Sequence, residues 1–126
     1  ANGAIIFRRM RPLEDDNWTR SACGAIADKH FSPAERNRVK GKKYGVRMII
    51  DSATGKVIEV NFNFLYREPM ATIPVSTYRK IELELKEKIW FTPTAGGKEM
   101  KFILTSWTQE VSPFQPLPDL VQNVKL

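Results

Sequence analysis

The stretch YGVRMIIDSATGKVIEVNFNF, residues 44–64, decides the fold of this 126-residue chain. Apolar side chains recur at every second position in residues 46–50 and again in residues 58–64. A period of two residues predicts β-strands with one buried face. Between them, residues 51–55 carry turn-forming side chains, and Gly55 can adopt a positive φ. The stretch therefore predicts a β-hairpin. Its second strand is predicted to turn Ile58, Val60, Phe62 and Phe64 toward the core, and Glu59, Asn61 and Asn63 toward solvent.

Two helices are predicted before the hairpin. Apolar residues at helical spacing predict a helix over residues 17–30, with Asp15 or Asp16 as its N-cap. Residues 32–35, Ser-Pro-Ala-Glu, match a capping box with proline in the first turn. The second helix is therefore short, and we expect it to end by Gly41.

A third helix and a third strand are predicted after the hairpin. Pro74 suits the first turn of a helix, and the helix is predicted to end at Trp90–Phe91. Gly96–Gly97 predicts a turn, and the alternation over Met100–Trp107 predicts a strand. The third helix has an apolar stripe made of Val75, Tyr78, Ile81, Leu85 and Ile89.

The two ends of the chain have a different character. Ala4–Phe7 is a short apolar run that is typical of a strand start. Three prolines at positions 113, 116 and 118 predict an extended tail over residues 112–126. We therefore expect one domain over residues 1–111, followed by this tail.

The order of elements is helix, strand, turn, strand, helix, strand. A sheet with alternating faces must cover its apolar face with helices. The sequence thus predicts an α+β fold: an antiparallel sheet built on a central β-hairpin, with helices packed on one face. No apolar run is long enough to span a bilayer.

Residues 44–108 resemble the C-terminal domain of TonB-type energy transducers. The matching stretches are VRMIID at 46–51, GKVIEV at 55–60, WFTP at 90–93 and GKEMKFIL at 97–104. The resemblance implies a β-β-α-β core preceded by an N-terminal helix, a cell-envelope setting and binding through a sheet edge. The whole chain is also similar to small exported Bacteroidetes proteins of uncharacterised function, which would share the fold without the energy-coupling role.

The positive charge is concentrated in the first third of the chain. The net charge is +6, and residues 1–47, with 11 basic and 5 acidic residues, hold the whole excess. A basic run of this kind could contact nucleic acid, an anionic surface or an acidic partner, or could simply be a solvated loop. The candidate basic patch consists of Arg36, Arg38, Lys40, Lys42, Lys43 and Arg47.

The residues argue against an enzyme. Cys23 and His30, the single cysteine and single histidine, lie seven residues apart on the first predicted helix. That spacing separates them by about 10.5 Å along the axis, whereas a nucleophile lies about 3 Å from its base. No metal-ligand spacing, P-loop or dinucleotide-binding motif occurs. We therefore expect a structural Cys23, no catalytic residue, no metal and no cofactor.

The third strand offers the most concrete candidate site. If Met100–Trp107 lies at the sheet edge, its unpaired backbone groups can pair with an extended peptide, which Ile103, Thr105 and Trp107 would flank. Alternatively, the tail over residues 112–126 covers this edge.

The expected function is therefore non-enzymatic: a periplasmic or secreted binding module for a protein or peptide partner. The alternatives are a basic binder of nucleic acid or anionic surfaces through residues 36–47 and a structural subunit of an envelope assembly. Nucleic acid is disfavoured because Phe62 and Phe64 share the predicted core face instead of forming a stacking platform. A homo-oligomer is left open.

Overall fold

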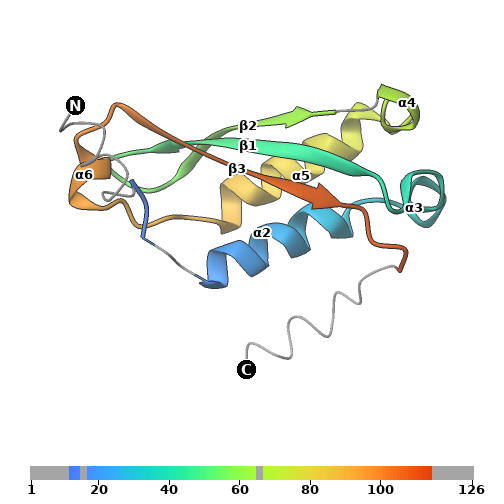
Figure 1. Cartoon of the computed structure of the whole chain (residues 1–126), viewed down its shortest axis with the longest axis horizontal. Helices are drawn as coiled ribbons and strands as arrows, with labels where there is room; N and C mark the ends of the chain where they lie inside the picture. The colour runs from blue at the N-terminus through green and yellow to red at the C-terminus, as the bar shows by residue number, and fades with distance from the viewer. Residues whose placement is uncertain (1–11, 15–16, 65–66, 115–126) are drawn as a thin grey trace, which may run out of the picture.

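The chain folds into one antiparallel three-stranded sheet with helices beneath one face (Figure 1). The structure, a computed structural model, describes residues 12–14, 17–64 and 67–114. The strand order is β2-β1-β3, so the hairpin strand β1 is central. The described elements are α2 (Asn17–Lys29), α3 (Pro33–Val39), β1 (Lys43–Asp51), β2 (Val57–Asn63), α4 (Arg67–Met70), α5 (Val75–Lys88), α6 (Ala95–Lys98) and β3 (Phe102–Glu110).

The α+β class, the hairpin and both longer helices are confirmed. The predicted strand at Ala4–Phe7, the N-cap at Asp15 or Asp16 and the tail beyond residue 114 lie outside the described residues. Ser32 caps α3 with both bonds of a capping box, as its sequence predicts.

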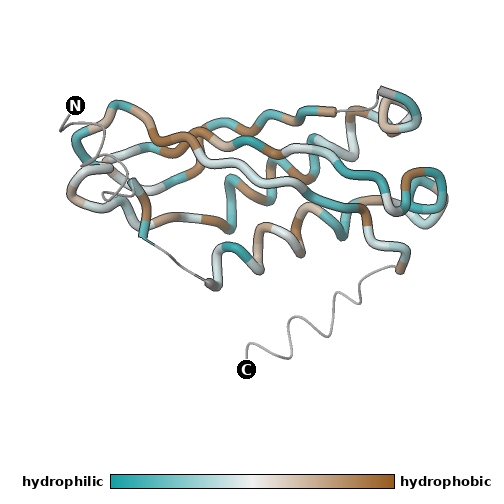
Figure 2. The backbone as a smooth tube through the Cα atoms, in the orientation of Figure 1, coloured by the Kyte–Doolittle hydropathy of each residue, from teal (hydrophilic) through white to brown (hydrophobic). Residues whose placement is uncertain are grey.

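The core lies between the sheet and the two long helices. Alternate residues of β1 point toward α2 and α5, and Figure 2 shows hydrophobic and hydrophilic residues alternating along both helices. This alternation is expected of helices that bury one side. The residues of β1 that the core buries almost completely are Tyr44, Val46, Met48 and Ile50.

The predicted facing of the second strand is wrong at one position. The β1–β2 register shifts between Ile49 and Ile50, so Ile50 pairs with Val57 and Ile49 with Glu59. This bulge leaves Ile58 unpaired and turns it outward, where it is 44% exposed, while Val57 is buried. Beyond the bulge the predicted alternation holds, because Val60 is buried and Phe62 packs against the core.

The chain between α5 and β3 also differs from the prediction. α5 ends at Lys88 instead of reaching Phe91, because Trp90 forms a β-bridge with Lys56 beside the hairpin turn. Gly96–Gly97 lies in the short helix α6 and not in a plain turn. The helix forms because the Thr94 hydroxyl caps it by accepting a hydrogen bond from the Gly97 N–H at 3.0 Å.

Glu84 of α5 joins the two long helices. Its carboxylate accepts hydrogen bonds from Lys29 Nζ (2.6 Å) and Lys88 Nζ (3.0 Å) and lies 2.6 Å from His30 Nε2. Burial alone would raise the pKa of Glu84, but the hydrogen bonds from Lys29, Lys88 and His30 outweigh it and lower the pKa to about 2. This carboxylate is therefore held in its charged form in the folded chain.

We expect Glu84→Gln to lower the free energy of unfolding at pH 7 by about 1–2 kcal/mol. Because the folded pKa lies below the ordinary value of 4.5, the wild-type advantage is complete above pH 4.5 and disappears as the pH falls toward 2. Urea unfolding of the wild type and of Glu84→Gln between pH 2 and 7 measures the difference in their free energies of unfolding. Glu87→Gln, on the exposed side of the same helix, is the control and should leave stability unchanged at every pH.

Candidate functional site

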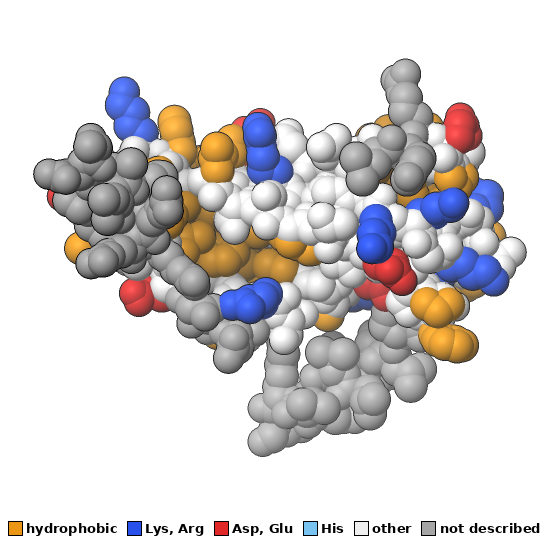
Figure 3. Space-filling view, in the orientation of Figure 1, with side chains coloured by type: hydrophobic (Ala, Val, Ile, Leu, Met, Phe, Trp, Pro, Cys, Tyr) orange, Lys and Arg blue, Asp and Glu red, His pale blue; other side chains and the backbone are white. Residues whose placement is uncertain are grey.

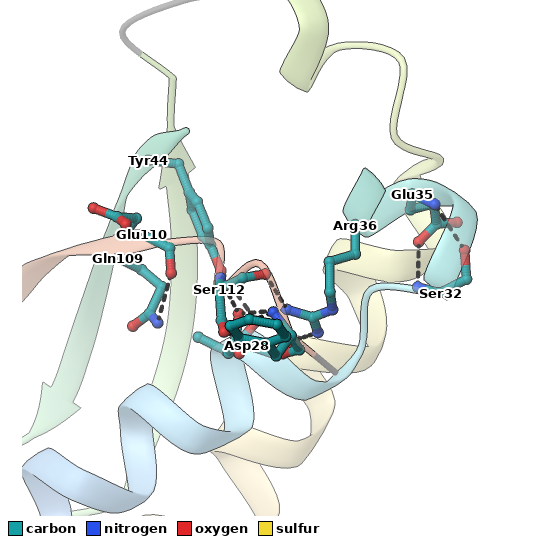
Figure 4. Close-up of polar contacts among 10 residues, drawn as sticks. Asp28, Ser32, Glu35, Arg36, Tyr44, Gln109, Glu110 and Ser112 are labelled. Carbon is teal, nitrogen blue, oxygen red and sulfur yellow. Dashed lines mark hydrogen bonds and ion pairs between the residues drawn. The ribbon is translucent and has the colours of Figure 1, made fainter. Parts of the chain in front are cut away.

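The first residue of the predicted basic patch is buried. Arg36 is 3% exposed, and its guanidinium binds Asp28 Oδ1 at 3.0 Å, the Asp28 backbone carbonyl and the Ser112 carbonyl at 3.0 Å. Asp28 Oδ1 also accepts the Ser112 N–H at 3.0 Å. Figure 4 shows this cluster between α2, α3 and the chain that follows β3. Arg36 therefore fastens three segments together and does not belong to a binding surface.

The rest of the basic run does not form one cluster on a single element. Arg38 of α3 hydrogen-bonds Thr72 through Nε at 3.3 Å. Arg47 lies on the outer face of the sheet, where it is the register partner of Ser106. Lys40, Lys42 and Lys43 are exposed around the start of β1. The basic run thus combines a structural residue with charges on separate surfaces.

The cysteine and the histidine serve different parts of the core. Cys23 is 4% exposed, and burial raises the pKa of its thiol to about 11. His30 hydrogen-bonds Glu84, as described above. A thiol held in its neutral form is a poor nucleophile. Among the described residues, no group of three His, Cys, Asp or Glu side chains could hold a metal ion.

The third strand is at the edge of the sheet. Within the described residues, β3 pairs with β1 along its whole length and with no strand on its other side. The nine residues of β3 keep one continuous register, from Lys43–Glu110 to Asp51–Phe102. This regular edge is the feature that strand addition requires.

The register identifies the backbone groups at this edge. The Val111 N–H donates to the Lys42 carbonyl at 2.9 Å, one step beyond the Lys43–Glu110 pair. Hydrogen-bonded and non-bonded pairs alternate in an antiparallel ladder, so the odd-numbered residues of β3 bond to β1. The backbone N–H and C=O groups that face away from β1 are those of Phe102, Leu104, Ser106, Thr108 and Glu110.

The other edge strand is less suited to strand addition. β2 is shorter, with seven residues, and the bulge opposite Ile49 and Ile50 breaks its register. Lys56, just before β2, is already bridged to Trp90. Bulges and covered ends are the means by which proteins protect sheet edges.

A groove of about 460 Å³ runs beside the β3 edge, between β3 and α2. In Figure 3, hydrophobic side chains are visible at the bottom of the hollow between these two elements. Arg20 is the single charged residue among the described residues that line it. The lining consists of Leu13, Thr19, Arg20, Cys23, Gly24, Met48, Phe91, Thr105, Ser106, Trp107 and Gln109.

The three predicted flanking residues all lie on the inner face of β3, but they differ in access. Ile103 is fully buried, so it cannot contact a bound peptide. Thr105 and Trp107 are half-buried and line the groove, and Trp107 Nε1 donates to Gln109 Oε1 at 2.8 Å. The sequence reasoning missed the contribution of α2, which supplies the opposite wall. It also missed Phe102 and Leu104, which are each 57% exposed on the outer face.

The end of β3 turns away from the sheet. Ser112 bonds to Asp28 near the end of α2, so the chain leaves the sheet edge at this point. The alternative that the tail over residues 112–126 covers the edge stays a prediction, because residues 115–126 lie outside the described part. No helix of the described residues is long and apolar enough to cross a membrane.

Comparison with known proteins places the chain in a family. The family model described as "Domain of unknown function (DUF5043)" matches residues 2–107. The chain belongs to the DUF5043 family. Its matched region contains all three strands up to Trp107. A search of the curated proteins gave no match.

A solved relative has the same overall fold. The DUF5043 chain is similar to a crystal structure of a DUF5043 family protein from Bacteroides uniformis, with a TM-score of 0.76 and 33% sequence identity. The match covers 86% of this chain and 63% of the relative, so the DUF5043 chain spans less than two thirds of that protein's length.

Proposed function

We propose that this DUF5043 chain is a binding module that takes up an extended peptide segment of a protein partner as an added strand along β3. The observation that carries the proposal is the regular, nine-residue edge of β3 with a groove beside it. The backbone groups of the peptide would pair with those of Leu104, Ser106 and Thr108. Main-chain pairing supplies affinity, and the pockets for alternate side chains supply selectivity.

The groove fits this mode of binding better than a small-molecule site. Its wall on one side is the strand edge itself, and Thr105 and Trp107 point into it from that strand. A strand added to β3 would place every second side chain over these two residues. The side chains on the other face would lie beside the exposed Phe102 and Leu104.

We further propose that the domain is related to the TonB C-terminal type and acts in the cell envelope, in the periplasm or after secretion. The sequence motifs of residues 44–108 and the order β1-β2-α5-β3 support this kinship. Binding through a sheet edge is what that resemblance implies, and β3 supplies such an edge.

We expect Ser106→Pro to weaken peptide binding while leaving the fold intact. The Ser106 N–H faces the free edge, so proline removes a donor that the peptide needs without removing a bond to β1. Peptides are first selected from a random ten-residue display library on the wild-type chain. Their affinities for wild type and variant are then measured by fluorescence polarisation, and we expect a loss of about tenfold or more.

The matched control is Ser106→Thr, which keeps the N–H and should bind within about twofold of wild type. Circular dichroism checks that both variants have the wild-type spectrum. Selected peptides that bind Ser106→Pro as tightly as wild type would show that they do not use this edge. That result, or the recovery of no peptide at all, would overturn the proposal.

A further inference from the structure

The outer face of the sheet is apolar at the start of β3. Phe102 and Leu104 point away from the helices, and Leu104 is the register partner of the half-buried Ile49. An added strand places its outward side chains directly beside those of the edge strand. Apolar side chains on the bound peptide would therefore cover Phe102 and Leu104 at this end.

The inner face is apolar as well. The groove is lined by Leu13, Cys23, Met48 and Phe91, and Arg20 is the single charged residue among the described residues of its lining. A bound strand presents its side chains alternately to the two faces. Both faces favour apolar groups, so the peptide needs apolar side chains at successive positions and not merely at every second one.

Positive charge flanks the middle of the same edge from both faces. Arg47 on the outer face is the register partner of Ser106, and Arg20 lines the groove together with Ser106 on the inner side. The chain as a whole carries a net charge of +6. Two consecutive carboxylates on a bound strand would point to opposite faces, so each would face one arginine. Such charge complementarity favours acidic peptides over basic ones.

Resting on the proposed function, we infer that the partner segment is an acidic-hydrophobic peptide, with two or more consecutive apolar residues next to consecutive carboxylates. The apolar residues lie beside Phe102 and Leu104, and the carboxylates lie at the level of Ser106. This assigns the chemistry of the partner, whereas the edge pairing alone would accept many sequences.

The test uses two fluorescein-labelled synthetic peptides, Ser-Gly-Ile-Val-Ile-Glu-Glu-Thr-Gly-Ser and the same peptide with both Glu replaced by Lys. Each is also made in reversed order, because the strand can add in either direction. Fluorescence polarisation with the full chain should show that the better Glu peptide binds at least tenfold more tightly than either Lys peptide. Arg20→Glu/Arg47→Glu should reverse this preference.

Lys80→Glu is the control for the exchange of a basic residue for glutamate: it makes half the charge change of the double variant, on the exposed side of α5, and should keep the wild-type preference. Suppose that the Glu and Lys peptides bind equally tightly and that Ser106→Pro weakens the binding of both. This result would overturn the inferred chemistry of the partner but would still support the edge site. Failure of all four peptides to bind would also overturn it. Binding that survives Ser106→Pro would instead count against the edge site itself.

Discussion

Arg36→Ala is expected to lower the free energy of unfolding by about 3–5 kcal/mol. The side chain that it removes is buried and binds both the carboxylate and the backbone carbonyl of Asp28. Asp28 would be left as a buried charge with only the Ser112 N–H as its described partner. An unpaired buried charge costs far more than a lost surface ion pair. Urea unfolding followed by circular dichroism measures the effect.

Arg38→Ala is the matched control, because Arg38 lies two residues further along the same helix and its hydrogen bonds to Thr72 are exposed. It should cost about 0.5 kcal/mol or less. In the double variant Asp28→Asn/Arg36→Met no buried charge remains, and the neutral amide can still accept the Ser112 N–H. We expect it to be more stable than Arg36→Ala. Equal costs for Arg36→Ala and Arg38→Ala would contradict the structural role of the cluster.

The hairpin and the longer helices could be predicted because their signals are local. The period-two pattern of residues 46–50, the glycine of the turn and the capping box at Ser32 each act over a few residues. The outward turn of Ile58 could not be predicted, since the bulge arises from how β1 and β2 pair. A strict alternation read along one strand contains no information about its partner.

The candidate site shows the same division between local and distant information. The sequence indicated the third strand as an edge, but the groove has one wall from α2 and one from β3, far apart in the chain. Arg36 looked like its exposed neighbours because charge is visible in the sequence and burial is not. Its carbonyl partner at Ser112 lies 76 residues away. Long-range contacts of this kind separate a structural arginine from a binding one.

We expect Gly55→Ala to lower the free energy of unfolding almost as much as Arg36→Ala does, although no charge is involved at this position. Gly55 has a φ of +80°, and an added Cβ would lie 1.8 Å from the Phe91 carbonyl oxygen. The approach is close because the Phe91 N–H donates to the Gly55 carbonyl at 2.8 Å, joining the hairpin turn to the chain after α5. We expect a loss of about 3 kcal/mol or more from the combined strain and overlap.

Gly41→Ala separates these two causes. Gly41 has nearly the same backbone angle, with a φ of +79°, but an added Cβ there would meet no atom within 4 Å. Its substitution should therefore cost only the left-handed backbone penalty of about 1–2 kcal/mol. Thermal and urea unfolding of both variants gives the difference, which measures the overlap with the segment after α5, chiefly with the Phe91 carbonyl and to a lesser extent with Pro93. Equal losses of unfolding free energy in the two variants would contradict the close packing of the hairpin turn against the segment after α5.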